Sequence, residues 1–238
     1  MSLGRRDFLK GLVACGTLAV MQRPAWASVG VMSPAVRPGE SPLLLRTGTL
    51  VDQEFFGAVQ AVLGSVGVAA AERLQLDRSD LARPQNLQRG LQSARGRCVV
   101  GVIEGAHAPL LFELLRSAGV AVPCAGEHSD AGPIADGASR HRLLTTPASY
   151  GIAALLQRGV PAALVEEHAL GVATVPVPTT VPRDQPTGHW AAVTGHLLAR
   201  VAVGTWKPSP PLARRPGLPP TDDQPTRHYA SFVLQLPA

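Results

Sequence analysis

Residues 97–124 read RCVVGVIEGAHAPLLFELLRSAGVAVPC, and this stretch decides the fold class. Residues 98–104 form a continuous apolar run that ends at Glu104, as in a strand buried on both faces. Residues 109–119 are rich in leucine and end at a glycine, which is typical of a helix and its stop. Residues 120–124 then return to an apolar strand. Continuous apolar strands separated by a helix predict parallel pairing in a sheet that is covered on both faces.

The same alternation continues on both sides of this stretch. Further strands are expected at 43–45, 72–77, 140–145, 161–167 and 228–236, and further helices at 52–63, 79–91, 148–158 and 187–203. The chain shows no internal repeat. We therefore predict one α/β domain over residues 43–238, with three layers and a mixed, mostly parallel sheet of about five to seven strands. Prolines cluster in 174–186 and 207–225, which are predicted to be loops.

The N-terminal residues have the pattern of an export signal. Residues 4–10, GRRDFLK, resemble the twin-arginine signature, with Arg5 and Arg6 as the recognised pair. The apolar stretch that follows is too short and too rich in glycine and alanine to span a bilayer. It ends at an A-x-A cleavage site, which predicts cutting between Ala27 and Ser28. The resemblance implies export to the periplasm by the twin-arginine translocase, with 28–42 as a linker to the folded domain.

A competing interpretation takes residues 12–15, LVAC, as a lipobox with an acylated Cys15. Cutting there would leave most of the apolar region on the mature side, so we prefer cleavage at Ser28 and expect no membrane anchor afterwards. Removing residues 1–27 leaves 18 basic and 16 acidic residues, a net charge of +2. The high isoelectric point therefore belongs largely to the signal, and we expect no nucleic-acid partner.

In an open α/β sheet, ligands bind beyond the carboxyl ends of the strands. That rule selects Glu104, Gly105 and His107 after one strand, and Thr146 and Ser149 after another. A carboxylate and an imidazole in one short loop could act as acid and base, or hold a metal. The alternative is a surface Glu104 beside a histidine that packs under its helix, and the helical spacing of His107 with the leucines favours that alternative.

Ser149 lies in residues 147–151, PASYG, which approach the G-x-S-x-G nucleophile elbow but lack its first glycine. Thr146 followed by Pro147 is also an ordinary capped helix start. We therefore prefer a structural role for Ser149 over that of a nucleophile.

Two histidines flank the turn-like residues 130–137, DAGPIADG. A hairpin centred between Ile134 and Ala135 would place His128 directly opposite His141, close enough to share a metal. A slip of one residue would separate them, and a solvated, charged hairpin is the preferred interpretation.

The mature chain holds two cysteines, Cys98 and Cys124, and an oxidising compartment normally pairs them. If 98–104 and 120–124 are adjacent parallel strands, these residues are out of step by roughly 13 Å. A disulfide needs Cα atoms within about 7 Å, so we expect two buried, free thiols.

No metal, nucleotide or cofactor motif is visible, so the sequence assigns no cofactor. The favoured hypothesis is an exported binding or accessory protein that holds a small ligand or a periplasmic partner at the carboxyl edge of the sheet. The alternatives are a hydrolase that uses Glu104, His107 or Ser149, and a metal-binding protein that uses His107, His128 and His141.

Overall fold

A computed structural model describes residues 41–81, 83–130, 139–160, 164–169, 175–177, 189–208 and 227–237. The predicted signal peptide lies outside these residues, including Arg5, Arg6 and the cleavage site between Ala27 and Ser28. Nearly all of the predicted linker at 28–42 and most of the two proline-rich segments also lie outside them.

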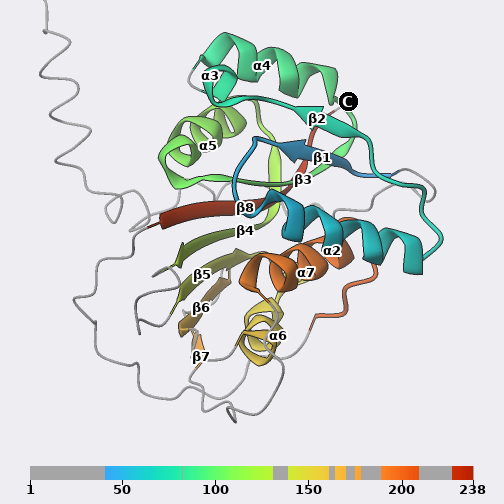
Figure 1. Ribbon diagram of the computed structural model, residues 1–238, viewed down its shortest axis with the longest axis vertical. Coiled ribbons are helices and arrows are strands. Elements are labelled where there is room, and N and C mark those ends of the chain that lie inside the picture. Colours follow the sequence, from blue (N-terminus) through green and yellow to red (C-terminus); the bar gives the residue numbers. More distant parts are fainter. Residues whose placement is uncertain are drawn as a thin grey trace, which may run out of the picture.

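The described chain alternates strands and helices along most of its length (Figure 1). The strands are β1 (Leu43–Arg46), β2 (Arg73–Gln75), β3 (Cys98–Glu104), β4 (Ala121–Asp130), β5 (Arg140–Thr145), β6 (Leu164–Ala169), β7 (Val175–Val177) and β8 (Arg227–Gln235). The α-helices are α2 (Asp52–Ser65), α3 (Arg78–Leu81), α4 (Pro84–Ser93), α5 (Ala108–Ser117), α6 (Ile152–Gly159) and α7 (Trp190–Ala202). Two short 3-10 helices, η2 (Gly105–His107) and η3 (Pro147–Ser149), precede α5 and α6.

The strands form one mixed sheet in the order β2-β1-β3-β8-β4-β5-β6-β7. Helices cover both of its faces, so the predicted three-layer α/β architecture is confirmed. The balance of pairings differs from the expectation of a mostly parallel sheet. β1 pairs in parallel with β2 and β3, and β5 with β6, whereas the other four pairings are antiparallel. Strand β7 also lies within the segment 174–186 that was predicted to be a loop.

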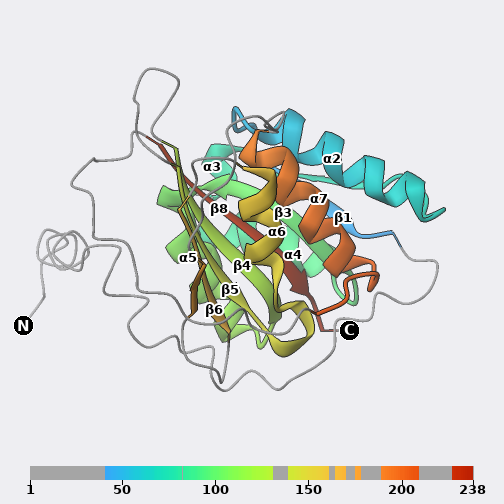
Figure 2. The same cartoon turned by 90° about the horizontal axis from the view of Figure 1, so that it is seen from below.

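Each face of the sheet has its own hydrophobic core. The first, which we call the α7-side core, joins α2, α6 and α7 to the sheet and includes Phe55, Leu63, Val100, Leu156, Leu197 and Val233. The second, the α5-side core, joins α3, α4 and α5 to the opposite face and includes Leu45, Leu87, Ile103, Leu111, Leu115 and Phe232. Figure 2 shows α2 and α7 lying next to each other along the first of these faces.

The C-terminal strand β8 lies in the middle of the sheet, between β3 and β4. Its side chains alternate between the two cores, which explains why so apolar a strand is central rather than at an edge. The predicted adjacency of 98–104 and 120–124 is therefore wrong. Cys98 and Cys124 are buried and free, as predicted, but the reason is that an intervening strand, with an offset of two residues along it, keeps them about 12 Å apart.

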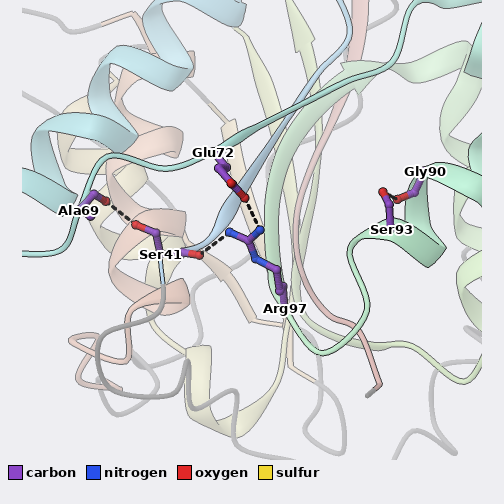
Figure 3. Close-up of polar contacts among 6 residues, drawn as sticks. All are labelled: Ser41, Ala69, Glu72, Gly90, Ser93 and Arg97. Carbon is purple, nitrogen blue, oxygen red and sulfur yellow. Dashed lines mark hydrogen bonds and ion pairs between the residues drawn. The ribbon is translucent and has the colours of Figure 1, made fainter.

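Polar contacts fix the amino ends of the parallel strands (Figure 3). The Arg97 guanidinium, just before β3, donates to the Glu72 carboxylate before β2 and to the Ser41 carbonyl before β1. The Ser41 hydroxyl donates in turn to the Ala69 carbonyl. The three parallel strands are thus tied together at one end, and the loops that could hold a ligand lie at the other.

No helix of the described residues is both long enough and apolar enough to cross a membrane.

Candidate functional site

The strongest candidate site lies at the carboxyl ends of two neighbouring parallel strands whose following helices lie on opposite faces of the sheet. β1 and β3 are paired, with Leu45 opposite Gly101. The chain leaving β1 enters α2 in the α7-side core, and the chain leaving β3 enters α5 in the α5-side core. In open α/β sheets such a topological switch point is where ligands bind. The Glu104–His107 segment therefore lies at the position that the fold itself favours.

The β1 side of this switch point is residues 47–52. Gly48 has a positive φ of 75°, which lets the chain turn out of β1. The buried Asp52 carboxylate accepts a hydrogen bond from the Gly48 amide at 2.9 Å and another from the Thr49 hydroxyl. The Thr47 hydroxyl donates to the Val102 carbonyl of β3 at 3.3 Å. Asp52 thus organises a loop that was not among the predicted site residues.

The β3 side holds the residues that were predicted. Glu104 is half-buried at the end of β3, and Gly105 begins η2. A Cβ on Gly105 would lie 2.9 Å from the Cβ of His228 at the start of β8, so only glycine allows this close approach. The Nδ1 atom of the half-buried His107 is itself buried and has no hydrogen-bond partner among the described residues. This segment therefore carries both a carboxylate and an imidazole. His228, from a distant part of the sequence, lies beside the segment at Gly105.

Thr146 and Ser149, the two candidate residues that follow another strand, do not lie at this site. β5 runs antiparallel to β4 and therefore opposite to β3, so its carboxyl end lies at the other edge of the sheet. The Ser149 hydroxyl is buried, donates to the Pro123 carbonyl at 2.5 Å and accepts from the Thr146 amide at 2.9 Å. The bond from the Thr146 amide is one half of a capping box, and the Thr146 side chain completes it by accepting from the Ser149 amide, which supports the preferred structural role.

That opposite edge has a buried carboxylate of its own. One oxygen of Glu167, on β6, accepts hydrogen bonds from the Thr145 hydroxyl and from the Gly151 amide, both at 2.9 Å. Burial raises the pKa of Glu167, while these hydrogen bonds act in the opposite direction. Gly151 has a φ of 91°, which delays α6 until Ile152 instead of the predicted start at Ala148. Glu167 therefore holds the start of α6 against the sheet.

The predicted hairpin register is confirmed, since His128 on β4 lies directly opposite His141 on β5. Their Nδ1 atoms are 2.9 Å apart. Both side chains are buried, however, so the preferred solvated hairpin is wrong for this pair. Residues alternate between the faces of a strand, and the neighbours Glu127 and Arg142 point to the other, more exposed face.

The histidine pair sits under α7. The Nε2 atom of His128 is 2.7 Å from the Ser231 hydroxyl, and that of His141 is 3.0 Å from the Ser139 hydroxyl. The Trp190 ring stacks on His128 with its centroid 4.5 Å away. Burial, and secondarily His141, lowers the pKa of His128 well below its ordinary value.

The described residues supply no third histidine, cysteine, aspartate or glutamate that could complete a metal site with this pair. The two Nδ1 atoms also face each other at hydrogen-bonding distance. Two ligands of one tetrahedral zinc ion would need a separation of about 3.3 Å. We therefore assign no metal to His128 and His141.

Comparison of the chain with protein-family models, with curated proteins and with solved structures finds no significant match.

Proposed function

We propose that this protein is an exported binding or accessory protein that holds a small polar ligand at the switch point between β1 and β3. One observation carries the proposal: the chains leaving these two paired strands enter helices on opposite faces of the sheet, beside Glu104 and His107. Export by the twin-arginine route remains part of the proposal and depends on the resemblance at residues 4–10.

The charges at the switch point favour one class of ligand. Asp52 already accepts the hydrogen bond of the Gly48 amide, so that amide is not free for a phosphate or carboxylate. The Glu104 carboxylate would repel an anion as well. It would accept hydrogen bonds from an amine or a hydroxyl, and His107 could donate to or accept from a second polar group. A small amine or polyol therefore fits better than a phosphorylated metabolite.

The first test is a thermal-shift screen of the full chain against amines, amino acids, polyols and sugars, with inorganic phosphate for comparison. A ligand present at 100 times its Kd should stabilise the fold by about 2.7 kcal/mol, or about 5–10 °C in Tm. Glu104→Gln and His107→Gln should abolish this shift and change the ligand-free Tm little. Glu113→Gln on α5, which removes an exposed carboxylate from an ion pair with Arg116, is the matched control and should keep the shift.

A packing role for His107 makes a different prediction. His107→Ala would then cost about 1–3 kcal/mol in unfolding free energy through a cavity and lost hydrogen bonds. Ligand affinity per folded molecule would stay unchanged. That combination, or a hit whose shift survives Glu104→Gln, would place the binding site elsewhere.

Export is tested separately. Replacing both Arg5 and Arg6 by lysine should retain the precursor in the cytoplasm, because the resemblance assigns recognition to the two guanidinium groups. Mass spectrometry of the exported protein should find Ser28 at its N-terminus. Periplasmic appearance of the double variant would contradict the signal assignment, and a lipidated Cys15 would contradict the cleavage site.

A further inference from the structure

The buried histidine pair is part of a continuous chain of four polar side chains. Ser231, His128, His141 and Ser139 follow one another at 2.7, 2.9 and 3.0 Å. They belong to β8, β4, β5 and the residue preceding β5. Ser231, His128 and His141 are buried, whereas Ser139 is half-buried.

With both imidazoles neutral, every link of the chain can be a hydrogen bond. If the Ser231 hydroxyl donates to His128 Nε2, the Nδ1–H of His128 can donate to His141 Nδ1. The Nε2–H of His141 then donates to Ser139, and the reverse direction works equally well. One proton therefore occupies the short space between the two Nδ1 atoms. The neutral pair is fully compatible with this geometry.

Each proton added to the neutral pair disfavours this arrangement. The first would make both nitrogens of His128 donors, with the Ser231 hydroxyl now accepting from Nε2, and would bury a positive charge. The second would place two N–H groups face to face across 2.9 Å. Two positive charges cannot hold that separation without a counter-charge, so the second proton breaks the link between β4 and β5 side chains.

Among the described residues, the groups that share this face with the pair come from four elements. They are Tyr229 and Ser231 on β8, Trp190 on α7, Glu167 one step further along β6 on the same face, and Glu104 on β3 two strands away. Glu167 is already engaged with Thr145 and Gly151. Beyond Trp190, His189 is paired with Glu54 of α2. A proton on the pair would therefore place a charge among buried side chains, which is unfavourable.

Trp190 connects the pair to the first turn of α7. Its ring contacts His128 at 4.5 Å, His141 at 5.7 Å and Tyr229 at 5.5 Å between centroids. The side chain is 4% exposed, so the sheet and the histidines bury almost all of it. The ring shields the imidazoles from solvent, and a charged pair could be hydrated only if this ring moved away.

We propose that His128 and His141 form an acid-sensitive latch, which holds Trp190 and the first turn of α7 on the sheet while neutral and releases them when protonated. This inference does not depend on the proposed ligand. In the closed state the pKa of His128 is lowered, so the released state binds more protons. The latch therefore stays closed above about pH 6.5 and opens as the pH falls. Each pH unit below that value should raise the ratio of open to closed molecules by up to about tenfold for each proton that opening takes up.

The test follows Trp190 fluorescence in the full chain carrying Trp26→Phe and Trp206→Phe, which leaves one indole. Between pH 7.5 and 4.5 the emission should shift reversibly to longer wavelength as Trp190 meets water, while far-UV circular dichroism stays constant. His141→Asn, whose amide can replace the Nδ1 hydrogen bond without titrating, should abolish the shift. His196→Gln is the matched control, because His196 lies on α7 but is exposed to solvent, and it should keep the shift.

Three results would overturn the latch. These are constant emission down to pH 4.5, a shift that coincides with loss of circular dichroism, or a shift that persists in His141→Asn. If His141→Asn does not fold, imidazole 15N spectra of the unsubstituted chain decide the question. Protonation of the pair together with exposure of Trp190 supports the proposal, and a pair that stays neutral at pH 4.5 refutes it.

Discussion

Adding one methyl group between α2 and α7 tests the layer that defines the switch point. A Cβ on Gly195 of α7 would lie against the Phe55 carbonyl oxygen of α2, well inside contact distance, and at 3.1 and 3.2 Å from the Phe55 carbonyl carbon and Cα. All three are backbone atoms of a helix, so no side chain can turn away. The two helices would have to move apart.

Gly195→Ala should therefore destabilise the protein. Forcing an extra carbon into a packed interface costs about 1–3 kcal/mol, and the rigid backbone contact places this case near the upper end. Alanine recovers up to about 1 kcal/mol through its better helix propensity. The expected net loss is about 2 kcal/mol, or about 4–8 °C in Tm for a chain of this size.

Gly57→Ala is the matched control because Gly57 is a helical glycine of α2 with no atom within 4 Å of an added Cβ. It should stabilise by about 0.5–1 kcal/mol through helix propensity alone. Chemical denaturation of both variants measures the difference directly. Equal effects in the two variants would show that α7 does not pack on α2. The placement of α2 on the face opposite to α5, on which the proposed switch point depends, would then lose its support.

Three more outcomes follow from the described contacts. Ser149→Ala should lower the unfolding free energy by about 0.5–2 kcal/mol, measured in urea, because it removes the capping box; a loss of enzymatic turnover without a stability change would instead indicate a nucleophile. Alkylation without reductant should label Cys98 and Cys124 only after denaturation, since burial raises their thiol pKa values, that of Cys98 to about 12; a recovered bridge would contradict the sheet order. Burial also raises the pKa of Glu167, so unfolding releases a proton and this group's contribution to stability falls as pH rises through that pKa. Glu167→Gln can keep both hydrogen bonds to its oxygen and should remove that slope in melts between pH 4 and 7, whereas an unchanged slope would assign it to another group.

Local patterns were sufficient for the elements and for one long-range contact. The apolar run at 98–104 and the leucine-rich segment after it gave β3 and α5 close to their observed bounds. The turn-like residues 130–137 gave the register of β4 and β5, because a hairpin pairs residues by simple counting from its turn. Burial of the histidines could not be counted in this way. It depends on Trp190, which lies 49 residues beyond His141 in the sequence.

Two of the five candidate residues, Thr146 and Ser149, lie at the other end of the sheet for a reason that lies outside their own sequence. The carboxyl-end rule brings Glu104 and Thr146 together only if β3 and β5 run in the same direction. The C-terminal strand β8 enters between β3 and β4, and the hairpin after β4 then reverses β5. The hairpin proposed between His128 and His141 already implies that reversal, although Thr146 and Ser149 themselves do not indicate it. The same insertion brings His228 beside Gly105, a contact between residues 123 positions apart.

Helix α7 links the two features that the structure singles out. Its first turn covers His128 and His141, and Gly195, little more than one turn later, packs on Phe55 in the first turns of α2. The same α2 begins at Asp52, which orders the β1 loop at the switch point. A change at the histidine pair that moved α7 would therefore have a direct path of packed atoms to that loop. Since coupling between two sites is reciprocal, a ligand at the switch point that orders this loop should also shift the pH at which Trp190 is released.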